Sequence, residues 1–444
     1  MSASSAEVCA TTAMTFTSRD VTYGRWTMFR QKEYMIAAYF VGTLLALATS
    51  AAQAQEPLKI GYSIAQTGGL APNGRSALLA HQIWEEDINA KGGLLGRRVK
   101  LICYDDQSNP ATVPAIYEKL LDVDKVDTVI GGYGTNMLAA AMPAAIQRQK
   151  VLIGLFGLAV NAKFAYPKYF SMIPLGPTPK SAQTKGFFDI ATAQNPKPQT
   201  VAIVAADAEF AINGSEGARE NARGTGLKIV YDKRYPPSTT DFAPIVRAIQ
   251  AANPDIVVIL SYPPDTVGMV RAVNEVGYKP KMIGGGMVGL QATAIKMQLG
   301  PLLNGFVNFD YWIPIEKMEF PGVSEFLTRY QARARQEGVD ALGYGIAPWG
   351  YAQLQVLQQA IAATKSLDDT KLADYIHSSV FRTLIGDVTF GPEGEWADSR
   401  VLEVQFQHIN GAGLEQFKDL STEAVISPAQ YKTGNLIYPY EMAK

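Results

Sequence analysis

Apolar runs of strand length alternate with amphipathic segments along the chain from Pro57 onward. The run LKIGYSIA, residues 58–65, is followed by a loop rich in Gly, Pro and Asn and then by an amphipathic stretch at 77–90. The next apolar run, at 98–106, begins the same cycle again. Strands that alternate with helical patterns in this way predict parallel βαβ units.

The cycle occurs in two series, which are separated by the Pro- and Gly-containing segment at 173–181. The second series runs from the apolar run at 200–206 to PKMIGGG at 280–286. A third part, at 323–379, is helical without strands, so its helices must pack on a sheet that has already formed. We therefore predict an α/β fold with two lobes, each built on a doubly wound parallel sheet.

The order of these elements also predicts how the chain is divided between the lobes. It implies three crossings, near residues 176, 306 and 384. The expected first lobe comprises residues 55–176 and 306–384, and the expected second lobe comprises 177–305 and 385–444. Three crossover strands between two lobes make a hinge and leave a cleft.

Residues 1–54 have the organisation of a secretory signal peptide. A basic region precedes an apolar run at 35–50, and the small-x-small sequence AQA follows at 52–54. The apolar run is short for a membrane anchor, and no cysteine follows it to carry a lipid. We therefore predict export by a cleavable signal peptide and no lipid anchor.

The charge and the scarce metal-binding residues exclude several functions. The 444-residue chain has a formal net charge of −1 at pH 7, which gives no electrostatic signature of nucleic-acid or anionic-lipid binding. Of the two cysteines, only Cys103 would remain after cleavage, which is too few for a disulfide framework or a zinc site. His81, His377 and His408 have no metal-ligand spacing. We therefore predict no metal and no cofactor.

Two short segments resemble catalytic or cofactor motifs, and neither supports the corresponding function. GGGMVG at 284–289 fits G-x-G-x-x-G, and Asp310 lies at about the distance of an acid that binds ribose. That fingerprint belongs in the first βα turn of a fold, so we interpret this late one as a tight glycine turn at the cleft edge. NGSEG lacks the glycine two residues before Ser215 that a nucleophile elbow requires. Without a nucleophile–base pair, we predict no enzymatic activity.

Loops at the carboxyl ends of the predicted strands carry the candidate binding residues, because open α/β sheets bind ligands there. The candidates are Thr135 and Asn136 at a helix start, Phe156, Gly157 and Ala159 in the LFGLA loop, and Phe210 and Tyr262 in the second series. Hydroxyls, amides and aromatic rings with little acid–base chemistry are typical of a binding site.

Several motifs together resemble one protein family. INAKGG followed by a strand that ends in YDD, the turn VIGGYGTN and the late segment IGDVTFGPEGEW are similar to the periplasmic substrate-binding proteins of branched-chain amino acid ABC transporters, in the Leu/Ile/Val-binding group. The resemblance covers essentially the whole chain after the signal segment. It implies the type I periplasmic binding protein fold and a monomeric periplasmic protein that delivers a small ligand to a membrane permease. The alternative is a ligand-sensing partner of a signalling receptor, with no role in transport.

The resemblance also implies how the ligand is held. In that family, a hydroxyl and backbone N–H groups at a helix start of the first lobe bind the ligand carboxylate. These groups correspond here to Thr135 and to the loop with Gly157 and Ala159. An aromatic ring of the second lobe closes over the ligand, and it corresponds to Phe210 and Tyr262.

Two departures from the family pattern concern the ligand itself. The family's acid for an α-ammonium group would fall at Gly286-Met287, and a further hydroxyl would stand at Ala159. One possible ligand is a branched-chain or related amino acid, whose ammonium group would be paired by a carboxylate from another loop, Asp207, Glu209 or Asp265. The other is a carboxylate or amide without an amine, such as a 2-oxo or aryl carboxylate.

Overall fold

The computed structural model describes residues 55–444, and the expected signal peptide, residues 1–54, lies outside the described residues. The first lobe is built on short parallel strands in the order β2-β1-β3. A parallel bridge between Tyr133 and Leu155 continues this order to the β4–β5 pair. The strands are β1 (Leu58–Ile64), β2 (Val99–Asp105), β3 (Thr128–Val129), β4 (Leu152–Gly154) and β5 (Tyr169–Ser171).

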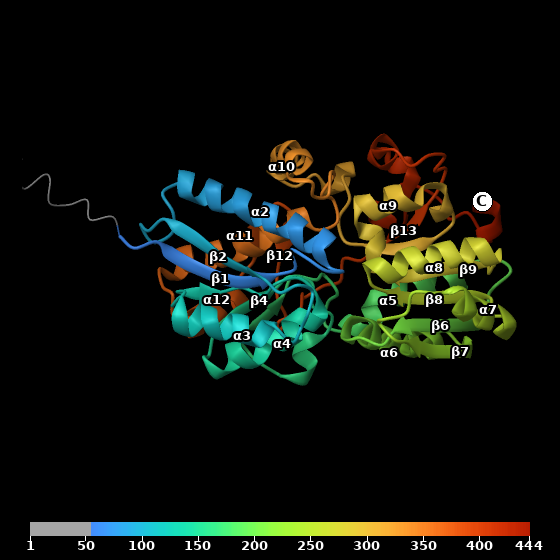
Figure 1. The fold of residues 1–444 in the computed structure, drawn as a ribbon, viewed down its shortest axis with the longest axis horizontal. Helices are drawn as coiled ribbons and strands as arrows, with labels where there is room; N and C mark the ends of the chain where they lie inside the picture. Colours follow the sequence, from blue (N-terminus) through green and yellow to red (C-terminus); the bar gives the residue numbers. More distant parts are fainter. Residues whose placement is uncertain (1–54) are drawn as a thin grey trace, which may run out of the picture. The chain divides into compact units, whose positions relative to one another are not determined.

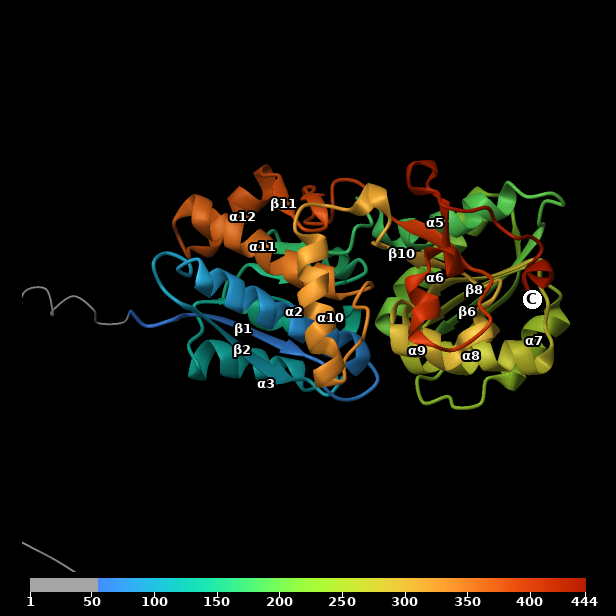
Figure 2. The same cartoon turned by 90° about the horizontal axis from the view of Figure 1, so that it is seen from above.

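Helices cover this sheet on both faces (Figure 1). Two of them, α3 (Val113–Glu118) and α4 (Thr135–Gln147), pack against each other. On the other side, α2 (Ala71–Ala90) packs against two helices of the late helical part, α10 (Val323–Glu337) and α11 (Ala347–Thr364). Figure 2 shows α10 and α11 alongside α2, as expected for helices added to a sheet that has already formed. The last helix of this part, α12 (Asp369–Ser378), packs on α11.

A buried polar chain joins α2 and α11 to the strand ends near the candidate site. His81 Nε2 pairs with Gln353 Oε1 at 3.1 Å, and burial lowers the pKa of His81 to about 4, so the ring is neutral at pH 7. Gln353 Nε2 donates to the carbonyl oxygens of Gly131 and Ile153, both at 2.7 Å. The bond to Gly131 holds the chain just after β3, before the turn that leads to α4, and the bond to Ile153 holds β4.

The second lobe contains a seven-stranded sheet in the order β14-β13-β10-β9-β8-β6-β7. Five strands are parallel, and β13 and β14 add an antiparallel edge. The strands are β6 (Thr200–Ala206), β7 (Lys228–Tyr235), β8 (Ile256–Ser261), β9 (Met282–Met287), β10 (Val307–Asp310), β13 (Leu402–Phe406) and β14 (Glu423–Ser427). The helices that pack on this sheet are α5 (Pro179–Thr192), α6 (Glu209–Gly224), α7 (Ala243–Ala252) and α8 (Pro263–Val276), and α9 (Thr293–Leu299) packs on α8.

We propose, from the strand pairing, that two of the three crossings lie later in the chain than the sequence pattern predicts. β10 pairs with β9 and β13, so it belongs to the second sheet, although 306 was the expected crossing. The hairpin of β11 (Phe381–Thr383) and β12 (Gly386–Val388) packs against α11, so the first lobe extends beyond 384. We propose that the second crossing follows Asp310 and the third lies between β12 and β13. The first and third crossing segments touch, because Leu175 and Ser399 form an antiparallel bridge.

Three of the four glycines of GGGMVG do not form a turn, so the interpretation was wrong for them, whereas Gly289 lies in the short 3-10 helix Val288–Gln291. Gly284, Gly285 and Gly286 lie inside β9. A Cβ on Gly284 would stand 1.8 Å from the carbonyl oxygen of Val307, and its φ is +133°. The glycines are therefore required by the close approach of β10 and by the strand's unusual backbone, not by a dinucleotide.

Within residues 55–444, no helix combines the length and the apolar character needed to cross a membrane. In the same range, no cluster of three His, Cys, Asp or Glu side chains offers a metal site.

Candidate functional site

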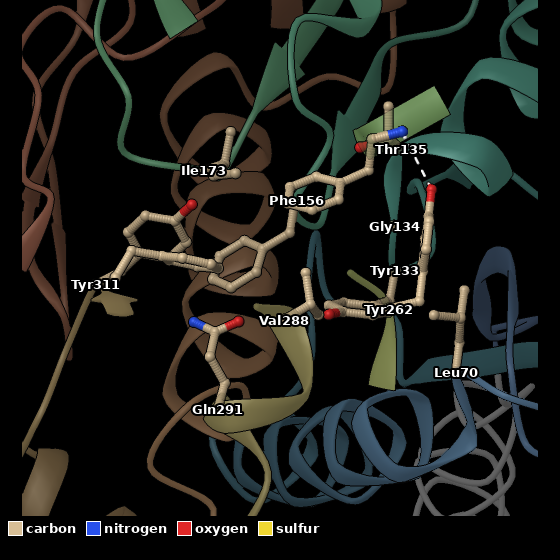
Figure 3. A pocket seen from close by; sticks show the side chains of 12 residues that line it. Leu70, Tyr133, Gly134, Thr135, Phe156, Ile173, Tyr262, Val288, Gln291 and Tyr311 are labelled. Atoms are coloured by element: carbon tan, nitrogen blue, oxygen red, sulfur yellow. Dashed lines mark hydrogen bonds between the residues drawn. The ribbon is translucent and has the colours of Figure 1, made fainter. Parts of the chain in front are cut away.

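A small cavity lies where the two lobes face each other, at the carboxyl ends of their strands (Figure 3). Its wall in the first lobe consists of Leu70, Tyr133, Gly134, Thr135, Phe156 and Ile173. The opposite wall consists of Phe210, Tyr262, Val288, Gln291, Phe309 and Tyr311. The cavity volume is about 30 Å³, which is room for about two water molecules. The structure is therefore closed, and a ligand the size of an amino acid requires side chains or lobes to move.

The start of α4 supplies the hydroxyl at this cavity. β3 runs into Gly131 and Gly132, and Gly134 has a φ of +100°, which turns the chain into the helix. Among the described residues, no side chain caps this helix, so its first N–H groups are available to a ligand. Thr135 Oγ accepts a hydrogen bond from the N–H of Leu158 at 3.1 Å and still has its own proton to donate.

The LFGLA loop contributes one ring to the cavity and otherwise shapes it. Phe156 and Ala159 have φ values of +60° and +54°, so both occupy the left-handed region that costs most residues energy. This backbone directs the Phe156 ring into the cavity, whereas Gly157 and Ala159 do not line it. A Cβ on Gly157 would stand 2.6 Å from Tyr169 Oη, so glycine is needed for packing there.

Tyr262 joins the two lobes directly. Its hydroxyl donates to Asn136 Oδ1 at 2.8 Å and accepts from the N–H of Phe210 at 3.1 Å. The rings of Phe210 and Tyr262 meet edge to face with centroids 5.9 Å apart. Burial raises the pKa of Tyr262, so its hydroxyl keeps its proton at neutral pH. Asn136 thus contacts the second lobe and does not itself line the cavity.

The acids considered as partners of an ammonium group are engaged elsewhere. Asp207 pairs with Arg234 at 2.9 Å, and Glu209 pairs with Lys163 of the first lobe. Asp265 accepts hydrogen bonds from Tyr235 Oη at 3.1 Å and from the N–H of Tyr262 at 3.4 Å. Among the residues that the structure describes, no carboxylate lines the cavity.

The sequence analysis missed an amide that does line it. Gly286 and Met287 lie at the end of β9 outside the cavity wall, and the wall is formed by the residues just after them, Val288 and Gln291. Figure 3 shows the side chain of Gln291 directed toward the aromatic rings. Its Nε2 is buried and has no partner within the described part of the chain. The position of Gln291 just beyond a strand's carboxyl end was the available signal.

Phe309 and Tyr311 were missed for another reason. They lie at the end of β10, which the sequence pattern assigned to a crossing near 306. Tyr311 Oη donates to Gln183 Oε1 at 2.6 Å, and its ring lies 5.2 Å from that of Phe156, between centroids. The site thus combines hydrogen-bond donors with a surrounding of aromatic rings, a composition that suits a ligand with an apolar body and an acceptor group.

Comparison with known proteins agrees with this geometry. Residues 57–407 match a family described as periplasmic binding protein. The chain belongs to the periplasmic binding protein family. This membership confirms the expected resemblance and the expected fold class, and it makes the chain a member of a solute-binding family and not of an enzyme class.

Relatives of this periplasmic binding protein include the Leu/Ile/Val-binding group. The Leu/Ile/Val-binding protein homolog 8 of Brucella suis biovar 1 (strain 1330) is 26% identical over 315 residues, which cover 68% of this chain and 76% of the relative. Homolog 7 of Brucella abortus (strain 2308) is 24% identical over 339 residues, 73% of this chain and 82% of the relative.

Solved structures share the fold at lower identity. A leucine-binding protein of Thermotoga maritima MSB8 has a TM-score of 0.69 and 19% identity, and the match covers 80% of this chain and 96% of that one. A solute-binding protein of R. palustris, solved in complex with 4-hydroxybenzoate, has a TM-score of 0.68 and 20% identity, with 80% and 94% covered.

Proposed function

We propose that this protein is the periplasmic solute-binding component of an ABC importer, which takes a small carboxylate-bearing ligand between its lobes and delivers it to a membrane permease. Membership of the periplasmic binding protein family supports the binding role. Solved proteins of the same fold that are described as parts of ABC transporters favour import over the sensing alternative. The proposal includes a monomer without enzymatic activity, exported by the signal peptide at 1–54.

The observation that carries the ligand class is the presence of hydrogen-bond donors, without a described carboxylate, at the cavity. The free N–H groups at the start of α4, the Thr135 hydroxyl and the unpaired Nε2 of Gln291 all donate, and no described carboxylate lines the wall. Donors at a helix start favour a negatively charged group. A buried ammonium group without an acid would cost several kcal/mol. We infer that 2-oxo or aryl carboxylates bind at least as well as leucine.

Thermal denaturation with a panel of ligands tests this function. A ligand at roughly 100 times its dissociation constant stabilises the folded protein by about 2.7 kcal/mol, which gives a measurable rise in melting temperature. We expect 4-hydroxybenzoate or the 2-oxo acids of leucine, isoleucine and valine to raise it at least as much as the amino acids do. If only the amino acids raise it, the ligand class is wrong, and an acid outside the cavity wall must reach the ammonium group.

Similar proteins contain both kinds of ligand, which makes the panel informative. A substrate-binding protein of Streptococcus pneumoniae was solved with isoleucine, and proteins of Rhodopseudomonas palustris were solved with hydroxybenzoates. Native mass spectrometry of the purified protein is the complementary measurement, because it identifies a ligand that co-purifies. If neither the amino acids nor the carboxylates without an amine raise the melting temperature, the proposed ligand chemistry is contradicted.

A further inference from the structure

A buried guanidinium group lies on the third crossing, close to the cavity. The backbone N–H of Arg400 donates to the carbonyl of Pro174 at 2.8 Å, and its Nη1 donates to the carbonyl of Ile385 at 2.7 Å. The other edge of the guanidinium, formed by Nε and Nη2, is also buried. Within residues 55–444, these two nitrogens have no hydrogen-bond partner.

Three aromatic rings lie against the guanidinium group. The guanidinium carbon of Arg400 lies 5.1 Å from the ring centroid of Trp396, 5.4 Å from that of Trp349 and 5.5 Å from that of Phe320. The indole Nε1 atoms of Trp349 and Trp396 are likewise buried and have no partner among the described residues. In the described part of the structure, four unpaired buried N–H groups thus belong to Arg400 and to two of the rings that lie against it.

The described acids do not compensate this charge. Among residues 55–444, Arg400 forms no salt bridge. Burial raises the pKa of Glu395, five residues before Arg400, to about 8, so that side chain is mostly neutral at pH 7, and it lies near Ser171. Burial lowers the pKa of Arg400 to about 10, which still leaves it charged. Unpaired buried charges and donors are expensive, so the arrangement calls for an anion.

One ring separates Arg400 from the ligand cavity. Trp349 meets Phe156 edge to face with centroids 5.2 Å apart and Tyr311 with centroids 6.0 Å apart, and both of these rings line the cavity. Because the cavity has room for about two waters, a bound ligand requires side chains or lobes to move. Displacement of Trp349 would join the cavity to the free edge of Arg400.

We propose that Arg400, with the indole N–H groups of Trp349 and Trp396, forms a second carboxylate subsite for the ligand. The subsite rests on the proposed solute-binding function and narrows it to ligands that carry two anionic groups, one at each end. Nε and Nη2 of an arginine form a planar fork that matches the two oxygens of a carboxylate. The start of α4 would hold one carboxylate and Arg400 the other.

Isothermal titration calorimetry on matched pairs of ligands tests the subsite. The pairs are benzoate with terephthalate and the straight-chain monocarboxylates with the dicarboxylates of four to seven carbons. We expect a dicarboxylate of fitting length to bind roughly tenfold to a hundredfold more tightly than its monocarboxylate. In Arg400→Met the ratio of the two affinities should fall to about one. Arg400→Lys keeps the charge without the fork and should give an intermediate ratio.

Melting temperatures without ligand provide the control for a purely structural role. Arg400→Met removes an unpaired buried charge, so the ligand-free variant should melt at the temperature of the parent protein or above it. A fall in melting temperature with an unchanged affinity ratio would overturn the proposal. Trp396→Phe removes only one donor, and the affinity ratio is measured again in this milder variant.

Acetate and chloride, added alone, test whether the subsite binds a free anion. If either anion raises the melting temperature of the parent protein but not that of Arg400→Met, the subsite belongs to that anion and not to the ligand. If monocarboxylates bind and no dicarboxylate binds more tightly, the proposed subsite is wrong and the proposed function stands. If no carboxylate binds, the proposed function is contradicted, and with it the subsite that rests on it.

Discussion

Thr135 shows how one side chain serves both the fold and the site. Its Oγ accepts from the N–H of Leu158, which fixes the LFGLA loop against the start of α4, and the residue lines the cavity. Gln291 differs, because its Nε2 has no partner within the described part of the chain. A polar group that is buried without a partner costs free energy in the ligand-free protein, and a ligand that accepts its hydrogen bond recovers that cost.

Replacing Thr135 separates these two roles. Thr135→Val keeps the shape and removes a hydrogen bond to a charged ligand that contributes about 1.5–3 kcal/mol, so affinity should fall about tenfold or more. The same change leaves the N–H of Leu158 without its acceptor and should lower the free energy of unfolding by about 1–3 kcal/mol. Thr135→Ser keeps the hydroxyl and is the matched control. Calorimetry and urea denaturation measure both effects, and equal affinity in the valine variant would refute the carboxylate assignment at this residue.

At the scale of elements, β9 carries the strictest requirement on the sequence. It lies between β8 and β10 in the middle of the second sheet, and its three central residues are glycines. The space for a side chain at Gly284 is taken by the backbone of Val307. Because Gln291 and Val288 follow directly from this strand, its position also sets the second wall of the cavity.

Two glycine substitutions test this requirement. Gly284→Ala places a Cβ 1.8 Å from the Val307 carbonyl oxygen at a φ of +133° and should lower the free energy of unfolding by at least about 3 kcal/mol. Gly224, at the end of α6, has no atom within 4 Å of its Cβ position, so Gly224→Ala should be neutral or stabilise the protein by up to about 1 kcal/mol. Denaturant unfolding of both variants measures the difference. Similar stabilities would show that β9 and β10 can separate without cost.

At the scale of the whole described unit, several hydrogen bonds join the lobes. Asn213 Nδ2 donates to the carbonyl of Leu158 at 2.9 Å, and Tyr262 Oη donates to Asn136 Oδ1. On another side, Thr293 Oγ1 donates to Asp340 Oδ1 at 2.8 Å. A ligand that contacts both walls would add to these bonds and shift the population toward the closed form.

Small-angle scattering should therefore show a smaller radius of gyration when ligand saturates the protein. Asn213→Ala removes one bond between the lobes and should weaken ligand binding several-fold by favouring the open form. Asn274 makes its bonds within the second lobe, to Val270 and Leu302, so Asn274→Ala is a control that affects stability and not closure. A radius that does not change under saturating ligand would contradict the two-lobe clamp.

Much of this protein follows from local signals in its sequence. The alternation of strand and helix patterns predicts both parallel sheets, because each pattern depends on the period of side chains within one element. The rule that ligands bind at the carboxyl ends of parallel strands selects loops whose residues Thr135, Phe156, Phe210 and Tyr262 line the cavity in the structure.

The features that the sequence did not predict depend on contacts between distant segments of the chain. β10 joins the second sheet because β9 and β13 pair with it, and Gly284–Gly286 lie in a strand because the backbone of Val307 lies against Gly284. The sequence pattern does not single out Arg400, and packing against Trp349, Trp396 and Phe320 buries its guanidinium with two nitrogens unpaired among the described residues. Such sites form where side chains from separate parts of the chain come into contact, and the periodicity within one segment does not predict such contacts.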